Sequence, residues 1–137
     1  MSALEETAHS TVAGVLAPHE TIQVWPADKH LFREGAPVDG VFVIHSGEVD
    51  LCFSSPKSGE AKALFVAGPG QILGLSCVVA NRPHDCTATT RSECITGFVQ
   101  SSQFLQLLDG KPDLWINVLR MISSNINACW DCMRELR

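Results

Sequence analysis

The side chains in this sequence that are best able to do chemistry are its histidines and cysteines. The histidines are scattered, and no H-x-H pair or other spacing typical of metal ligands occurs among His9, His19, His30, His45 and His84. A catalytic metal site needs several such ligands converging on one ion. We therefore expect no metal centre and a protein that is not an enzyme.

The cysteines are Cys52, Cys77, Cys86, Cys94, Cys129 and Cys132. The N-terminal residues SALEETAHSTVAGVLA lack a basic start before an apolar block, so we expect no secretory signal. The cysteines are then better interpreted as reduced thiols of a cytoplasmic protein than as a disulfide framework. Cys129 and Cys132 form a C-x-x-C pair, which could be redox-active, half of a metal site, or two small packing residues.

Length and charge narrow the class of protein further. A chain of 137 residues predicts one domain with a real hydrophobic core. The formal net charge is −5 and no Lys/Arg cluster is present, so we expect no DNA contact by this chain itself. No apolar run is long enough to span a bilayer, and we expect no membrane association.

A glycine-punctuated segment at residues 31–47, LFREGAPVDGVFVIHSG, indicates the fold class. Its three glycines mark turns or positive-φ positions, and the apolar run at 41–44 predicts a buried strand. Further short strands are expected at 21–25, 48–53, 61–66, 85–90 and 93–100. Turn residues cluster at 54–60 and 68–70. Short strands separated by regular turns favour a small barrel or jelly roll.

Helices are expected at both ends of the chain. Residues 2–16 predict an N-terminal helix that ends near Pro18. After residue 100 the apolar period lengthens, which predicts a short helix at 101–108 with Ser101 as its N-cap, stopped by Asp109-Gly110.

A long helix then begins at Pro112 and continues to the end of the chain. This order predicts an α+β, mainly β, protein. Its parts are an N-terminal helical segment at 1–20, a jelly roll at 21–100, and two helices at 101–137.

The last helix carries an apolar seam with spacings of 4 and 3 in alternation, which is the a/d pattern of a coiled coil. The seam consists of Trp115, Leu119, Ile122, Ile126, Cys129, Met133 and Leu136. Val118, Met121 and Trp130 lie off the seam and could pack the helix on its own barrel. We expect a parallel homodimer through the seam.

The chain resembles the cyclic-nucleotide-binding domain of the cAMP receptor and fumarate-nitrate regulator superfamily. The apolar pair Leu31-Phe32, then Gly35, the run at 41–44 and Gly47 occupy the places of its first signature. The family has the same plan of N-terminal helix, jelly roll, short helix and long dimerisation helix, so the resemblance covers nearly the whole chain. It implies a double-stranded β-helix jelly roll that senses a small-molecule effector in signal transduction and transcription regulation.

In that family a phosphate-binding cassette holds the ligand. A glutamate after a glycine takes the ribose hydroxyl, and an arginine with helix N–H groups takes the cyclic phosphate. The candidate ligand-binding residues here are Gly74, Leu75, Ser76, Arg82, Pro83 and His84. Gly74 matches, Leu75 occupies the glutamate position, and Pro83-His84 replaces the small pair after the arginine. These changes predict cAMP affinity weaker by about two to four orders of magnitude.

Several alternatives stay open for these residues. Arg82 is the only basic residue in reach but could be a solvated loop residue, and Ser76 could cap a short helix. A haem or metal site using His84, Cys77 and His45 is disfavoured, since a lone histidine in a β domain is more often structural. Redox sensing would rest on Cys129, because two copies of it could meet across a dimer axis and form a disulfide. No cysteine precedes Cys52, which disfavours an iron–sulfur cluster like that of the fumarate-nitrate regulators.

The leading hypothesis is a ligand-sensing regulatory domain whose ligand is unknown, with a cyclic nucleotide or another small anion as the expected class. In full-length relatives a helix-turn-helix follows the long helix, so DNA would be contacted through such a module beyond residue 137. A standalone signalling or dimerisation module that acts through a protein partner is the alternative. A jelly-roll enzyme of the cupin type would require a cluster of histidines.

Overall fold

Two antiparallel sheets form the body of the protein. The structure, a computed structural model, describes the backbone of residues 3–54 and 61–135 and the side chains of residues 10–52 and 66–124. The first sheet has the order β1 (Thr21–Trp25), β8 (Cys94–Gln100), β3 (Gly40–Ser46), β6 (Ile72–Leu73). The second has the order β2 (His30–Phe32), β7 (Thr87–Thr90), β4 (Val49–Ser54), β5 (Ala61–Ala67). The predicted mainly β jelly roll is confirmed.

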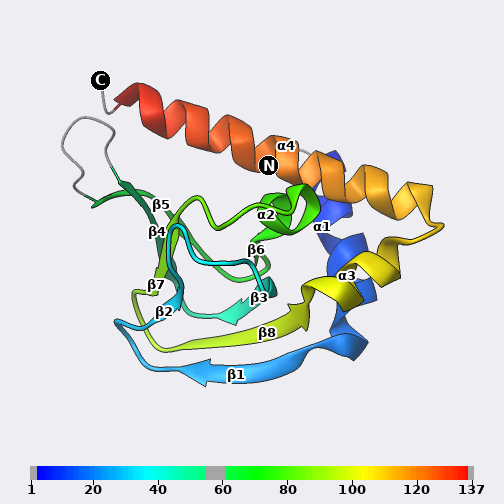
Figure 1. Cartoon of the computed structure of the whole chain (residues 1–137), viewed down its shortest axis with the longest axis horizontal. Helices are drawn as coiled ribbons and strands as arrows, with labels where there is room; N and C mark the ends of the chain where they lie inside the picture. The colour runs from blue at the N-terminus through cyan, green and yellow to red at the C-terminus, as the bar shows by residue number, and fades with distance from the viewer. Residues whose placement is uncertain (1–2, 55–60, 136–137) are drawn as a thin grey trace.

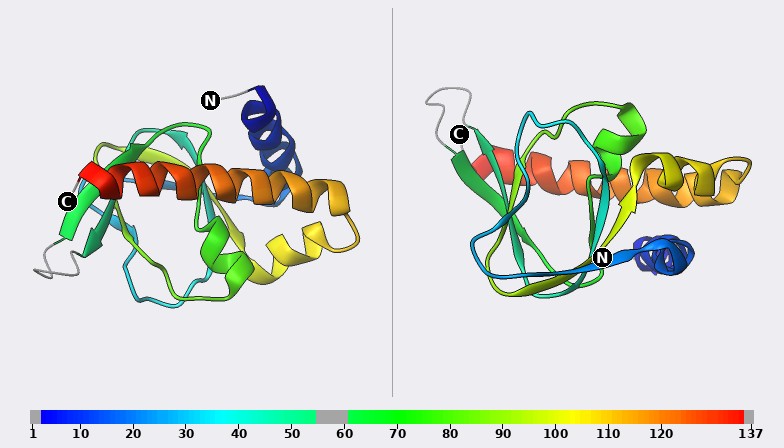
Figure 2. Two further views of the ribbon diagram at one scale, coloured as in Figure 1. Left: turned by 90° about the horizontal axis from the view of Figure 1, so that it is seen from above. Right: turned by 60° about the horizontal axis from the view of Figure 1, so that its bottom comes forward.

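The helices are α1 (Ala3–Leu16), a following 3₁₀ turn η1 (Ala17–His19), α2 (Leu75–Ala80), α3 (Ser101–Leu108) and α4 (Pro112–Glu135). Figures 1 and 2 show α4 running the length of the molecule, with α1 and α3 at the end where α4 begins. Within the described residues, no helix combines the length and apolarity that crossing a membrane requires.

Strand β3 is buried on both of its faces. Val41 and Val43 belong to a core cluster between the first sheet and the helices, which also contains Phe104 and Val118. The alternate side chains of β3, such as Ile44, point the other way into a second cluster between the two sheets. A strand that is covered on both faces needs apolar residues at consecutive positions. This explains why the run at 41–44 predicted a buried strand correctly.

The signature glycines have two different structural reasons. Gly35 and Gly47 have φ angles of +84° and +88°, in the region that side chains with a Cβ rarely adopt. Gly40 instead lies where β3 passes close to β8, because an added Cβ there would overlap the backbone carbonyl of Val99. Gly35 and Gly47 are therefore required by the backbone conformation, whereas Gly40 is required by the close packing of two strands.

Strand β1 shows the predicted alternation, but its buried face is the less apolar one. Ile22 and Val24 are 58% and 67% exposed, whereas Gln23 and Trp25 turn inward. The indole N–H of Trp25 donates to the hydroxyl of Thr96 on the neighbouring strand at 2.9 Å, which satisfies its buried polar group.

Two short strands, β2 and β6, were not predicted, because segments of two or three residues show no periodicity. The prediction that Ser101 caps α3 was wrong. The chain passes from β8 directly into α3, the N-cap is Gln100 without a side-chain bond, and the backbone N–H of Ser101 donates to the carbonyl of Asp39 at 2.9 Å. The predicted stop at Asp109-Gly110 is confirmed, with Gly110 at a φ of +70°.

Candidate ligand-binding site

A cavity of about 220 Å³ lies between the two sheets and is called the inter-sheet cavity below. Its lining comes from β1, β2, β3, β8, the loop before β3 and the segment before β7. The lining residues are Gln23, Trp25, Leu31, Phe32, Ala36, Pro37, Asp39, Phe42, His84 and Phe98. Its volume is below the roughly 300–1,000 Å³ of pockets for drug-sized ligands, so it suits a small molecule.

Aromatic rings form most of the wall. The ring of Phe42 contacts three others, with centroid distances of 5.0 Å to Phe98, 6.0 Å to Phe32 and 6.5 Å to Trp25. Such offset and edge-to-face arrangements are favourable for aromatic pairs. One wall of the cavity is therefore a cluster of contacting aromatic rings.

His84 closes one side of the cavity. Its imidazole is 5% exposed and stacks on Phe32 with a centroid distance of 3.8 Å and an interplanar angle of 12°. Its backbone is held by the loop before β3, because its N–H donates to the carbonyl of Ala36 at 3.0 Å and its carbonyl accepts from the N–H of Gly35 at 2.7 Å. Two backbone bonds and one ring contact fix the imidazole in place.

The charge state of His84 follows from this environment. Burial lowers the pKa of the imidazole below its ordinary value of 6.5, while the carboxylates of Asp85 and Asp39 oppose that shift. Among the described residues, no lysine or arginine lines the cavity. These residues therefore offer no permanent positive charge to a phosphate there.

Two other polar groups line the cavity. The side-chain oxygen of Gln23 is buried and, among the described residues, has no hydrogen-bond partner. Asp39 is exposed and brings a carboxylate to the cavity from the loop before β3. Both groups accept hydrogen bonds.

The residues predicted to bind a ligand lie in different environments, and only some of them are near the cavity. Gly74, at a φ of +92°, lies near the ring of His84. Leu75 is 2% exposed and packs in the core cluster on the helix side of the first sheet, away from the cavity lining. Arg82 and Pro83 are exposed, and neither lines the cavity.

Ser76 has a role other than the predicted one. The N-cap of α2 is Gly74, without a side-chain cap, so the expectation that Ser76 caps this helix was wrong. Its hydroxyl is hydrogen-bonded to Cys77 instead. Ser76 therefore contacts the thiol of its neighbour and does not line the cavity.

Sequence reasoning missed Gln23, Asp39 and the aromatic wall. The alternation in β1 was recognised, but a glutamine and a tryptophan on one strand face gave no indication that this face turns inward. The aromatic residues are spread over four strands, so only the fold brings them together.

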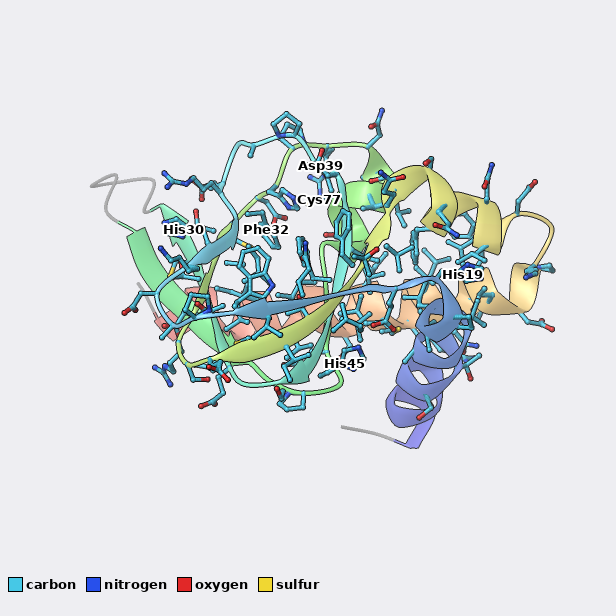
Figure 3. All side chains as sticks on the ribbon, turned by 90° about the horizontal axis from the view of Figure 1, so that it is seen from below. His19, His30, Phe32, Asp39, His45 and Cys77 are labelled. Atoms are coloured by element: carbon cyan, nitrogen blue, oxygen red, sulfur yellow. The ribbon has the colours of Figure 1, made fainter. Side chains whose placement is uncertain are left out.

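Two of the side chains named for a haem or metal site, His45 and Cys77, lie at separate places in the fold (Figure 3). Among the described residues, no group of three or more His, Cys, Asp or Glu side chains could hold a metal ion. Burial, aided by the charge of Asp85, raises the pKa of the Cys77 thiol. A protonated buried thiol is a poor nucleophile.

The described part of the apolar seam is partly buried and partly exposed. Trp115 and Ile122 are half-buried against the core cluster, and Leu119 is 53% exposed. Val118 and Met121 are buried beneath the helix, as the sequence predicted for the off-seam positions. The side chains of Ile126, Cys129, Trp130, Cys132, Met133 and Leu136 lie outside the described residues.

A protein-family model described as the cyclic nucleotide-binding domain matches residues 22–111. This match covers more than half of the chain, so the chain belongs to the cyclic nucleotide-binding domain family. The resemblance predicted from the glycine signature and the order of elements is thereby confirmed.

Individual relatives are distant in sequence. The chain is 22% identical over 112 residues to a CRP-like cAMP-activated global transcriptional regulator of Mycobacterium tuberculosis, covering 82% of this chain and 50% of that protein. The chain thus spans about half the length of the curated relatives it matches.

Solved structures share the fold closely. A cyclic nucleotide-binding domain from Methylobacillus flagellatus KT superposes with a TM-score of 0.81 at 19% identity, covering 98% of this chain and 82% of that chain. The regulatory subunit of a cAMP-independent protein kinase A from Trypanosoma brucei, solved as a mutant bound to cAMP, superposes with a TM-score of 0.73 at 14% identity. The two chains are covered to 98% and 52%.

The buried imidazole predicts a pH dependence of stability. Because burial lowers the pKa of His84 in the folded state, the unfolded chain binds more protons once the pH falls below about 6.5. Stability therefore decreases as the pH falls from about 6.5 through the lower folded-state pKa, by about 1.4 kcal/mol for each unit of depression.

Urea unfolding of the wild type and of His84→Phe, measured between about pH 7.5 and pH 5, tests this expectation. Phenylalanine keeps the stacking on Phe32 but cannot be protonated. The wild type should lose more stability than the variant over this range. Equal losses in both proteins would show that His84 is not the group responsible.

Proposed function

We propose that this chain is a ligand-sensing regulatory domain of the cAMP-receptor type whose cassette no longer recognises the cyclic phosphate. Membership of the cyclic nucleotide-binding family supports the regulatory part of the proposal. The observation that carries the second part is the environment of residues 74–84. Of the residues that the structure describes, no lysine or arginine lines the neighbouring cavity, and the imidazole of His84 is buried against Phe32.

The two contacts that the family makes to cAMP are altered in different ways. Leu75, at the position of the family's glutamate, is committed to the core cluster with Val78 and Phe104, so it offers nothing to a ribose hydroxyl. Arg82 is exposed and its backbone N–H donates to the carbonyl of Cys77 at the end of α2. A phosphate would therefore lack a buried permanent cation, and charge-assisted bonds are the strong ones in such sites.

Isothermal titration calorimetry with cAMP and cGMP tests this proposal. The missing ribose and phosphate contacts predict a loss of about two to four orders of magnitude in affinity, so we expect no saturable binding below about 100 μM. Arg82→Ala, on the exposed loop, should leave the titration unchanged. Micromolar cAMP binding that His84→Ala or Arg82→Ala abolishes would contradict the proposal.

A homodimer through α4 is the second part of the proposed function. An exposed Leu119 on a helix whose opposite face is buried supports a partner for this surface, because each large apolar side chain that is buried contributes about 1.5–3 kcal/mol. We propose that the regulatory signal passes through this dimer, to a DNA-binding module or to a partner protein.

Sedimentation equilibrium of the wild type, Leu119→Glu and Leu105→Glu tests the dimer. Leu105 is 37% exposed on α3 and serves as a matched control away from the seam. The wild type and Leu105→Glu should be dimers, whereas Leu119→Glu should be a folded monomer. Its melting temperature should be lower than that of the wild type, because it lacks the stabilisation that dimerisation gives to the folded state. A monomeric wild type, or an equal effect of both substitutions, would contradict this prediction.

A further inference from the structure

The inter-sheet cavity contains a hydrogen-bond acceptor without a partner. The side-chain oxygen of Gln23 is buried and, within the part of the chain that the structure describes, accepts no hydrogen bond. A buried polar group that stays unsatisfied costs about 1–3 kcal/mol, so such groups are rare and call for an explanation. Gln23 is also one of the residues that line the cavity, so a ligand whose N–H or O–H group reached this oxygen, after a small rotation of the amide, would satisfy it.

The second acceptor in the cavity is the carboxylate of Asp39. The backbone of this residue is anchored, because its carbonyl accepts a hydrogen bond from the N–H of Ser101 at 2.9 Å. Figure 3 shows Asp39 on the loop before β3. Because the described lining residues include no lysine or arginine to balance it, the carboxylate gives this part of the cavity a negative character.

The remaining walls are the faces and edges of aromatic rings. Trp25, Phe32, Phe42 and Phe98 surround the cavity, and the N–H of Trp25 is already used by Thr96. Aromatic faces attract planar rings by stacking and attract cations through the ring quadrupole. A planar, positively charged ligand would satisfy both the aromatic walls and the two hydrogen-bond acceptors, whereas an anionic ligand would not.

We propose that the inter-sheet cavity binds a small planar aromatic amine, with its ring between the aromatic walls, an N–H donated to Gln23 and its positive charge beside Asp39. This inference rests on the proposed function, because it names the class of ligand that the regulatory domain would sense. The ligand binds at the loop before β3, which is joined to His84 by two backbone hydrogen bonds. Binding there is therefore transmitted to the cassette segment that ends at His84.

Calorimetry with three simple probes tests the ligand class. Tryptamine carries an aromatic ring and a positive charge, indole-3-acetate carries the same ring with a negative charge, and 2-cyclohexylethylamine carries the charge without the ring. We expect tryptamine to bind with a dissociation constant of about tens to hundreds of micromolar, as befits a fragment-sized ligand. The other two probes should bind at least about tenfold more weakly.

Two substitutions locate the site. Asp39→Asn should weaken tryptamine binding about tenfold or more, and Gln23→Leu should weaken it as well. Asp28→Asn is the matched control, since Asp28 is an exposed loop residue at a φ of +65°, a conformation that asparagine tolerates, and it does not line the cavity. Thermal melts of all three variants establish that they fold, and the comparison of the three probes on the wild type needs no variant at all.

The inference is overturned if tryptamine gives no saturable heat up to millimolar concentration, if indole-3-acetate binds equally well, or if Asp39→Asn and Asp28→Asn behave alike. The cyclic-nucleotide titration separates this inference from the proposed function. Tight cAMP binding that tryptamine does not displace would contradict the proposed function and leave the amine site standing. If neither cAMP nor tryptamine binds, the amine site is overturned and the proposed function is not.

Discussion

The burial of β3 on both faces is the constraint on which the rest of the structure depends. One face of this strand packs on the helices through Val41 and Val43, and the other packs on the second sheet through Phe42 and Ile44. Because the side chains of a strand alternate between its faces, four consecutive apolar residues are required here. The strand therefore divides the interior into a helix-side core and an inter-sheet core, and each polar group near it must belong to one side.

This division places Leu75 and His84 on opposite sides of β3. Leu75 belongs to the helix-side core, where an apolar residue stabilises the packing of α2 against the first sheet. His84 belongs to the inter-sheet side, where it stacks on Phe32 and closes the aromatic cavity. An apolar residue at position 75 therefore stabilises the helix-side core.

The sequence predicted the scaffold much better than the site. The apolar run at 41–44 and the wide glycine spacing follow from local requirements of burial and backbone conformation, so both could be interpreted from the sequence alone. The inward orientation of Gln23 could not be predicted, because it depends on which face of β1 meets the second sheet. His84 was among the predicted ligand residues, whereas Asp39 was not, since an exposed loop aspartate becomes notable only when a cavity beside it lacks a cation.

The central claim is that the cassette histidine is buried and disfavours the charged form, so that this domain has exchanged phosphate recognition for a different ligand. The most direct measurement is an NMR titration of the His84 imidazole with and without saturating cAMP. The account predicts an apparent pKa below 6.5, because burial disfavours the imidazolium, and no change when cAMP is added. A pKa that lies at or above 6.5, or that rises on addition of cAMP as a phosphate stabilises the imidazolium, would contradict it.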